Sequence, residues 1–246
     1  MKVLAFNGSP KKDKGNTAVI LAPFLDGLRQ AGAEVELFYT KDLDINPCQG
    51  EFNCWLKTPG HCHQEDDMQK LHPKLRAADV WVFATPVYVW GVAGPLKNLM
   101  DRILPVLQPF ITLRDGHCSH PLGEGTKPAK IVLVANCGFW EMDNFDPLLA
   151  QMKAFCRILG FEFAGALLRP HGSALRAMLE MGAPVDDVLD AARRAGRELV
   201  RNGHIGEGTE LAVSRILLPL ETYIEFANRE FQAALERVQA AAGPGR

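Results

Sequence analysis

Short apolar runs alternate along the chain with longer segments in which apolar residues recur every three or four positions. An apolar run of about four to eight residues is typical of a strand buried in a parallel sheet, whereas the longer spacing is typical of an amphipathic helix. The short runs predict strands at 3–6, 34–39, 80–84, 131–135 and 161–168. The segments with helical spacing predict helices near 16–30, 67–78, 94–104, 145–159, 186–202 and 209–240.

Five strands that alternate with helices predict an α/β fold, an open doubly wound sandwich of three layers around a five-stranded parallel sheet. Ligands of such sheets bind beyond the carboxyl ends of the strands, where the strand order reverses. Residues 110–130 contain the turn Asp115-Gly116 and predict a hairpin inserted before the fourth strand. Residues 1–205 are expected to form the ligand-binding domain and residues 206–246 a helical C-terminal extension.

The composition narrows the classes of partner. The 246 residues include 27 basic and 29 acidic side chains, so their charge gives no reason to expect binding to nucleic acid or to an anionic membrane surface. We find no run of about twenty apolar residues that could span a bilayer, and the first apolar run is too short for a signal peptide. The six cysteines are scattered, unlike those of a disulfide-stapled secreted domain. A cytoplasmic protein is therefore expected.

The first predicted strand runs into a loop of small polar residues, and a helix begins directly after that loop. Asn7, Gly8, Ser9 and Pro10 end the strand, and Thr17 lies at the start of the helix. Free N–H groups and the positive end of the helix dipole attract phosphate at such a place, and hydroxyl groups can add donors. The loop has neither G-x-G-x-x-G nor G-x-x-x-x-G-K-[ST], so we expect a terminal monophosphate rather than a pyrophosphate or triphosphate.

Two later strands also run into loops that combine small residues with aromatic side chains. The third strand leads into residues 85–91, where Tyr88 and Trp90 offer flat faces to an aromatic ligand. The fourth strand leads into residues 136–140, which end with Phe139-Trp140. Any one of these aromatic side chains could instead belong to the core or to a subunit interface. Three such loops at the carboxyl ends of strands favour a ligand site.

The segments GSPKKDKGNT, TPVYVWGVAGPLKNLMDR and ANCGFWE resemble the three cofactor loops of the flavodoxin-like NAD(P)H-dependent FMN reductases, in particular those of the iron–sulfur flavoprotein branch. The resemblance extends over roughly residues 1–235. It implies a flavodoxin-like fold, bound FMN, and two-electron transfer from NAD(P)H to a small acceptor such as a quinone, free flavin, azo or nitro compound. Because the flavin supplies this chemistry, no catalytic side chain is assigned.

The same resemblance implies which residues bind the cofactor. The phosphate would be bound by Ser9, Lys11, Asn16 and Thr17. The isoalloxazine ring would lie along Pro86, Val87, Tyr88, Trp90 and Gly91, and it would be covered by Asn136, Cys137, Gly138 and Phe139. An alternative function is an electron-transfer protein that carries FMN, with or without an iron–sulfur cluster, and passes electrons to a protein partner.

The segment 48–62 carries part of a cluster motif. Members of the resembling branch that hold a [4Fe–4S] cluster have the pattern C-x2-C-x2-C followed by a fourth cysteine. This chain has Cys48, Cys54 and Cys62, but Glu51 stands where the second cysteine belongs. Because a cubane cluster normally needs four thiolates, a [4Fe–4S] cluster is not expected and no residue is assigned to a metal. The alternatives are a labile cluster, a zinc ion held with a nearby histidine, and a reactive Cys54 thiol.

Three further features of the sequence have simpler interpretations. The acidic residues 65–67 precede a predicted helix and are interpreted as stabilising its N-terminus. His117 and His120, in the predicted hairpin, are expected to face solvent. The helices after residue 205 carry more apolar side chains than a complete sandwich needs, and we expect a homodimer or homotetramer unless they cover one edge of their own sheet. These side chains are Leu211, Ile216, Leu217, Leu220, Ile224, Phe231 and Leu235.

Overall fold

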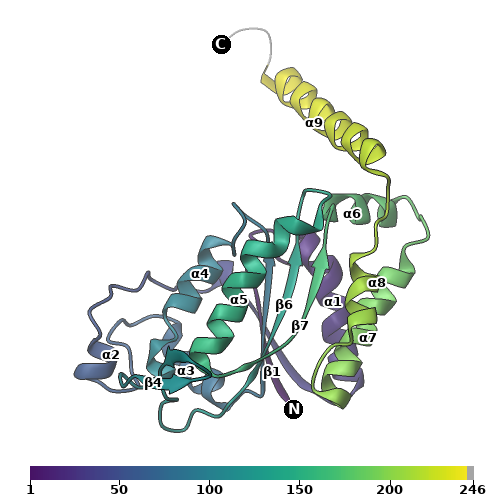
Figure 1. The fold of residues 1–246 in the computed structure, drawn as a ribbon. Coiled ribbons are helices and arrows are strands. Elements are labelled where there is room, and N and C mark those ends of the chain that lie inside the picture. The colour runs from purple at the N-terminus through teal and green to yellow at the C-terminus, as the bar shows by residue number, and fades with distance from the viewer. Residues whose placement is uncertain (243–246) are drawn as a thin grey trace.

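The computed structural model describes residues 1–242 and contains a five-stranded parallel sheet in the order β2-β1-β3-β6-β7. The strands are β1 (Lys2–Asn7), β2 (Glu34–Tyr39), β3 (Val80–Pro86), β6 (Lys130–Asn136) and β7 (Glu162–Arg169). The chain moves outward from β1 to β2 and then returns to place β3 on the other side of β1, so the strand order reverses there. The predicted doubly wound, flavodoxin-like α/β fold is confirmed (Figure 1).

Helices cover both faces of this sheet (Figure 1). One face is covered by α1 (Asn16–Gln30), α7 (Asp186–Asn202) and α8 (Glu207–Ser214). The other face is covered by α3 (Met68–Ala77), α4 (Gly94–Asp101) and α5 (Asp146–Leu159). The remaining helices are α2 (Asn53–Leu56), α6 (Gly172–Glu180) and α9 (Leu220–Ala242), with 3-10 turns η1 (Lys12–Lys14), η2 (Thr40–Asp42), η3 (Leu104–Val106) and η4 (Met142–Phe145).

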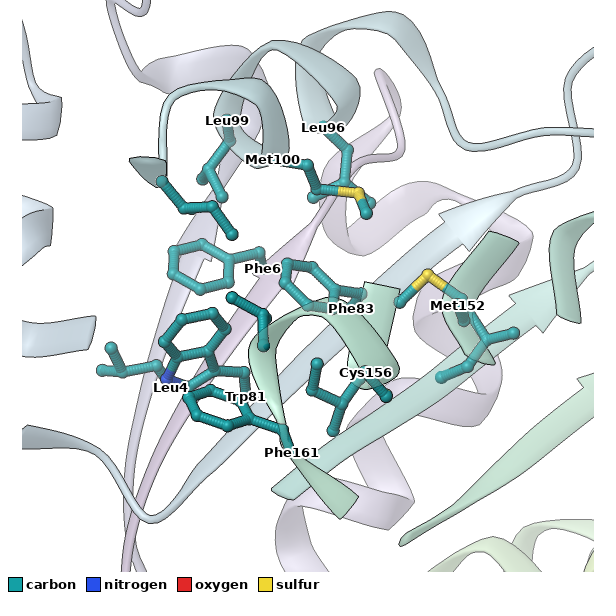
Figure 2. Packing of buried hydrophobic residues seen from close by; sticks show 14 of the residues in the cluster. Leu4, Phe6, Trp81, Phe83, Leu96, Leu99, Met100, Met152, Cys156 and Phe161 are labelled. Carbon is teal, nitrogen blue, oxygen red and sulfur yellow. The ribbon is translucent and has the colours of Figure 1, made fainter. Parts of the chain in front are cut away.

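The core is divided into two halves by the sheet, because successive side chains of a strand point to opposite faces. Phe6, Trp81 and Phe83 point toward α3, α4 and α5, where their rings pack together with Phe161 (Figure 2). The indole N–H of Trp81 donates to the carbonyl of Leu75 at 3.1 Å, so this fully buried ring leaves no polar atom unpaired. Apolar residues on both faces explain why the sequence shows continuous apolar runs rather than strict alternation.

Helices α1 and α7 approach each other closely through two glycines. A Cβ atom built on Gly27 would lie 1.9 Å from the carbonyl oxygen of Arg193, and one on Gly196 would lie 2.2 Å from that of Phe24. Both neighbours are backbone atoms and cannot move aside cheaply. The glycines therefore fix how α7 packs across α1 on this face of the sheet.

The inserted hairpin is present as predicted. Strands β4 (Thr112–Arg114) and β5 (His117–Ser119) pair antiparallel around Asp115-Gly116. Both turn residues have positive φ, 49° and 76°, as a two-residue type I′ turn requires. His117 is exposed as expected, whereas the ring of His120 lies 4.9 Å from that of Trp55 and its Nδ1–H donates to the Phe110 carbonyl at 2.9 Å.

Two predicted helices have different bounds, and α2 and α6 were not predicted. The helix predicted at 94–104 ends at Asp101, and the chain continues into the turn η3. The helix predicted at 209–240 is two helices, because residues 215–219 form an irregular connection between them, neither helix nor strand. Helix α6 has only nine residues, which is too short a segment for its apolar spacing to stand out in the sequence.

The two helices after residue 205 have different surroundings. Thr209 and Val213 of α8 are buried in the body of the molecule, whereas α9 stands away from it (Figure 1). The division at residue 205 stays a prediction, and residues 243–246 of the predicted extension lie outside the described residues. Within residues 1–242 no helix has both the length and the apolar character needed to cross a membrane.

Candidate functional site

The loop after β1 turns sharply into α1 and is shaped by its own side chains. The Asn7 side chain accepts a hydrogen bond from the Ser9 N–H at 2.9 Å, and Ser9 Oγ accepts one from the Lys11 N–H at 3.3 Å. A Cβ atom on Gly15 would lie 2.4 Å from Ser9 Oγ, so only glycine lets the hydroxyl reach this position. The N–H groups of the first turn of α1 have no partner inside the helix. The loop thus presents backbone donors, one hydroxyl and a helix N-terminus to the same edge of the sheet.

The predicted phosphate residues do not all face the same way. Ser9 and Thr17 are buried, Asn16 is half-buried and Lys11 is exposed. Thr17 Oγ1 donates to Asn136 Oδ1 at 2.6 Å, which ties the start of α1 to the end of β6. The structure therefore brings the first and third predicted loops together directly, through a buried hydrogen bond.

Arg176 on α6 reaches the first loop and was missed in the sequence. Its Nη2 donates to the Gly15 carbonyl and its Nε to Asn16 Oδ1, both at 2.8 Å. These contacts place a half-buried guanidinium beside the N-terminus of α1. Because the N-terminus is the positive end of the helix dipole, both groups favour an anion at this place. Arg176 was not predicted as a site residue because α6, the helix that carries it, was not predicted.

The loop after β3 holds its two exposed residues in an unusual backbone conformation. Tyr88 and Gly91 exchange two backbone hydrogen bonds, of 3.1 and 3.0 Å, around Val89 and Trp90. Val89 and Trp90 have φ of 48° and 58°, a region that costs free energy for residues other than glycine. The Val87 N–H also donates to the Asn136 carbonyl at 2.8 Å. The loop is therefore held firmly while Tyr88 and Trp90 remain half-exposed.

A cavity of about 220 Å³ lies between the second and third loops. Its lining is Val87, Val89, Trp90, Cys137, Gly138, Phe139 and Asn144. Asn144, which was not predicted as a site residue, accepts a hydrogen bond from the indole N–H of Trp90 at 3.2 Å and so fixes the ring at the cavity wall. The first loop does not line this cavity; it lies beside it through the Thr17–Asn136 contact.

The third loop is supported from beneath by the segment after β7. The Cys137 carbonyl accepts from the Gly172 N–H at 2.9 Å, and the Phe139 carbonyl accepts from the His171 N–H at 2.7 Å. The Tyr223 hydroxyl, at the start of α9, donates to the Gly138 carbonyl. Burial raises the pKa of the Cys137 thiol, so this sulfur is protonated at neutral pH and is not an activated nucleophile.

Two buried basic residues, Arg169 and His171, connect the segment below the third loop to residues 213–217. Arg169 is fully buried and donates to the carbonyls of Val213 and Arg215, at 2.7 and 2.6 Å. Burial, with repulsion from Arg215, lowers the pKa of Arg169 to about 10, which leaves it charged at neutral pH. The His171 Nε2 accepts from the Leu217 N–H at 3.1 Å, so the ring proton lies on Nδ1, which finds no hydrogen-bond partner within residues 1–242. Both side chains therefore bind the segment that leads into α9.

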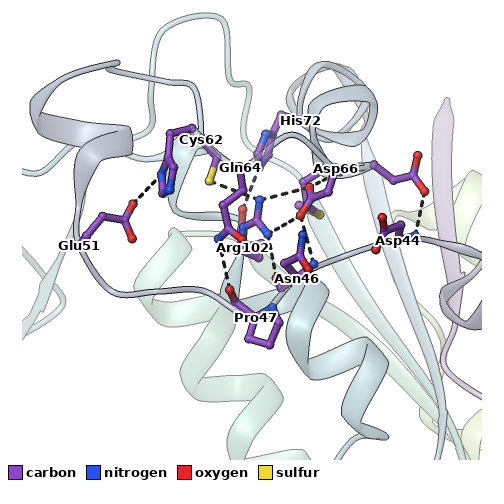
Figure 3. A network of polar contacts seen from close by, with 12 residues as sticks. Asp44, Asn46, Pro47, Glu51, Cys62, Gln64, Asp66, His72 and Arg102 are labelled. Atoms are coloured by element: carbon purple, nitrogen blue, oxygen red, sulfur yellow. Dashed lines mark hydrogen bonds and ion pairs between the residues drawn. The ribbon is translucent and has the colours of Figure 1, made fainter.

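The cysteine-containing loop surrounds a guanidinium group. Cys48, Cys54, Cys62 and Glu51 line one small cavity together with Arg102, whose Nη2 lies 3.3 Å from Cys62 Sγ (Figure 3). The Glu51 carboxylate contacts His63 instead, at 3.0 Å. Burial, with nearby acidic and thiol groups, raises the pKa of the Cys54 thiol to about 11. In the described part of the chain, no group of three or more histidine, cysteine or acidic side chains is placed to hold a metal ion.

Asp66 does more than stabilise a helix N-terminus. Its carboxylate accepts from the Met68 N–H, as the sequence interpretation expected, but also from both Nη atoms of Arg102, at 2.6 and 3.2 Å (Figure 3). The two side chains are 0% and 1% exposed. Burial alone would raise the pKa of Asp66, but the hydrogen bonds from Arg102 and from backbone N–H groups outweigh it and lower that pKa. This ion pair fastens the loop of residues 46–66 to the end of α4.

Residues 1–114 match the family model described as NADPH-dependent FMN reductase. The match covers a little less than half of the chain and shows that this part is similar to that family. The matched residues contain the first and second loops and the cysteine-containing loop, and the match ends before the third loop.

Several relatives and solved structures are similar to this chain. An iron–sulfur flavoprotein of Archaeoglobus fulgidus is 40% identical over 102 residues, which are 42% of this chain and 48% of that protein. The FMN-dependent NADH:quinone oxidoreductase 1 of Trichormus variabilis is 24% identical over 192 residues, 72% and 89% of the two chains. The fold is similar to that of an NAD(P)H:quinone oxidoreductase from Methanothermobacter marburgensis, with a TM-score of 0.55 and 21% identity over 81% and 96% of the chains. This chain spans about half the length of the curated iron–sulfur flavoproteins it matches.

Replacement of Arg102 by methionine should lower the free energy of unfolding by about 3–5 kcal/mol, because it leaves the Asp66 carboxylate buried and unpaired. The matched control is Asp101→Asn, which breaks a solvent-exposed contact with Lys97 and should cost less than about 1 kcal/mol. Urea unfolding of the two variants measures the difference. Equal effects would mean that the Arg102–Asp66 pair does not fasten the loop.

Proposed function

We propose that this protein is an FMN-dependent oxidoreductase that transfers two electrons from NAD(P)H to a small acceptor such as a quinone, free flavin, azo or nitro compound. The observation that carries this proposal is the cavity between the second and third loops, next to a helix N-terminus that presents phosphate-binding donors. Both lie at the edge of the sheet where the strand order reverses. The family match and the names of the relatives support the same chemistry.

The residues present fit FMN. Ser9, Lys11, Asn16 and Thr17 would bind its phosphate, and Arg176 adds a cation at the same place. Pro86, Val87, Tyr88, Trp90 and Gly91 would lie along the ring, with Asn136, Cys137, Gly138 and Phe139 on its other side. When bound, FMN supplies the two-electron redox chemistry, and the protein binds and orients it.

The side chains at the cavity shape the site rather than transfer protons. Trp90 is held by Asn144, and the turn around Val89 is closed by two backbone hydrogen bonds. Such a rigid wall positions a flat ligand without a loss of loop entropy on binding. Phe139 is 60% exposed and Tyr88 49% exposed, so apolar surface remains for a second flat molecule. Because FMN would supply the redox chemistry, we assign no side chain as acid or base.

A [4Fe–4S] cluster does not fit the residues of the cysteine-containing loop. A glutamate, Glu51, occupies one of the four positions where a thiolate is expected, and its carboxylate is paired with His63. A second, Cys62, is in contact with the Arg102 guanidinium, which belongs to a buried ion pair. The Arg102–Asp66 ion pair fastens this loop to the end of α4. This favours a reductase of small molecules over the alternative, an electron-transfer protein that serves a protein partner.

We also propose a cytoplasmic location and a homo-oligomeric state. The location follows from the expected class of cofactor-dependent reductase, and the oligomer from the apolar side chains left exposed after residue 205. They include Leu211, Ile216, Ile224, Phe231 and Leu235.

The purified protein should show a flavin absorption spectrum, which NAD(P)H bleaches in an anaerobic stopped-flow experiment and a quinone restores. Absence of flavin after reconstitution with FMN would contradict the proposal. A bound flavin that NAD(P)H leaves oxidised would instead support the electron-transfer alternative.

Replacement of Ser9 by alanine should weaken FMN binding by about 1–2 kcal/mol, the scale of a hydrogen bond to a charged group. Riboflavin lacks the phosphate, so it should bind the parent and the variant almost equally. Thr17→Ala should behave in the same direction, with an added loss from the broken contact to Asn136. Fluorescence titration of the two flavins measures both constants. An equal loss of riboflavin affinity in Ser9→Ala would show that this loop does not bind the phosphate.

Replacement of Glu51 by cysteine restores the four-thiolate spacing, and on anaerobic reconstitution this variant should take up iron and sulfide while the parent does not. The matched control is Glu65→Cys, which adds a thiol in an exposed position of the same segment. Iron analysis of the three proteins tests this. Roughly four iron atoms per chain in the parent would reverse the choice between the two proposed functions.

A further inference from the structure

Helix α9 carries apolar residues that repeat every seven positions. The first set consists of large side chains, Ile224, Phe231 and Val238. The second set lies three residues after each of these and consists of the alanines Ala227, Ala234 and Ala241. Spacings that alternate between three and four residues form the a and d positions of a coiled coil, which lie on one side of a helix.

This stripe has no partner within the described chain. Phe231 is 73% exposed, Val238 68% and Ile224 48%, and the helix points away from the sheet and its covering helices (Figure 1). A single helix in water is marginally stable, and most helices in proteins gain their stability by packing an apolar face. The 23 residues of α9 therefore need a surface to pack against.

We propose that α9 packs antiparallel against α9 of a second copy of this chain. In the register that fits the side chains, Phe231 lies against Ala234 of the partner subunit. One heptad to either side, Ile224 lies against Ala241 of the partner subunit, and Val238 against Ala227 of the partner subunit. Every layer then combines one large side chain with one alanine, so that the two helices can approach closely without overlap.

The charged residues beside the stripe agree with this register. Glu230 precedes Phe231 and Arg237 precedes Val238, so both occupy the same flanking position of their heptads. In an antiparallel pair these positions face each other, and Glu230 meets Arg237 of the partner subunit on both sides of the two-fold axis. In a parallel pair Glu230 would face Leu235 instead, and large side chains would meet large ones. Charge and size therefore both favour the antiparallel arrangement.

The opposite side of α9 argues against a membrane surface as the occupant. It carries residues of both signs, Glu225, Arg229 and Glu236, rather than the lysines and arginines typical of helices that lie on anionic lipid. A second copy supplies the complementary sizes and charges without any further partner.

Light scattering at micromolar concentration tests the contact. The parent should have at least twice the mass of the 27.1 kDa chain, and Phe231→Asp should halve the parent's mass. Gln232→Asp introduces the same charge one position away, outside the stripe, and should keep the parent's mass. A monomeric parent, or a Phe231→Asp variant with unchanged mass, would overturn the proposal.

Reversing the charges of Glu230 and Arg237 tests the antiparallel register. Lysine and glutamate are good helix formers, so these substitutions should leave α9 helical. Glu230→Lys and Arg237→Glu should each raise the dissociation constant of this contact by roughly tenfold, because two attractive contacts become repulsive. The double variant exchanges the charges and should return the constant to near that of the parent. Failure of the double variant to recover would exclude the antiparallel register, whereas recovery would be unexplained by a parallel pair.

Discussion

Burial of both faces of the parallel sheet is the constraint on which the rest of this structure depends. Because helices cover each face, the strands can carry almost only apolar side chains, as Phe6, Trp81 and Phe83 show. Polar groups that could recognise a ligand are thereby confined to the loops after the strands. The three loops then meet at one edge because the strands run in the same direction.

The loops are held to one another more firmly than loops on a surface need to be. Thr17 and Asn136 join the first and third loops, and the Val87 N–H joins the second to the carbonyl of Asn136. The end of β6 is therefore the common support of all three. Arg176 adds a fixed cation from a fourth segment. A site built this way resists distortion, because moving one loop disturbs the others.

The sheet, the hairpin and the three loops could be predicted from the sequence because each has a local signal. Apolar runs mark the strands, and Asp115-Gly116 marks the turn of the hairpin. The ion pair between Asp66 and Arg102 could not be predicted, because 36 residues separate the two and each is also explained by its own helix. Arg176 was not predicted because its helix, α6, was not predicted and because 160 residues separate it from Asn16. Contacts between residues far apart in the chain leave no local pattern in the sequence, so these contacts could not be predicted.

The buried imidazole of His171 sets an acid limit on the segment that it binds. Burial, with the nearby Arg169 charge, lowers the pKa of His171 to about 4 from an ordinary value near 6.5. The unfolded chain therefore takes up this proton more readily than the folded one, and acidification from pH 6.5 toward 4 favours the unfolded state. A proton on Nε2 also removes the acceptor of the Leu217 N–H. Protonation of His171 therefore weakens the short connection by which α9 is attached to the body of the molecule.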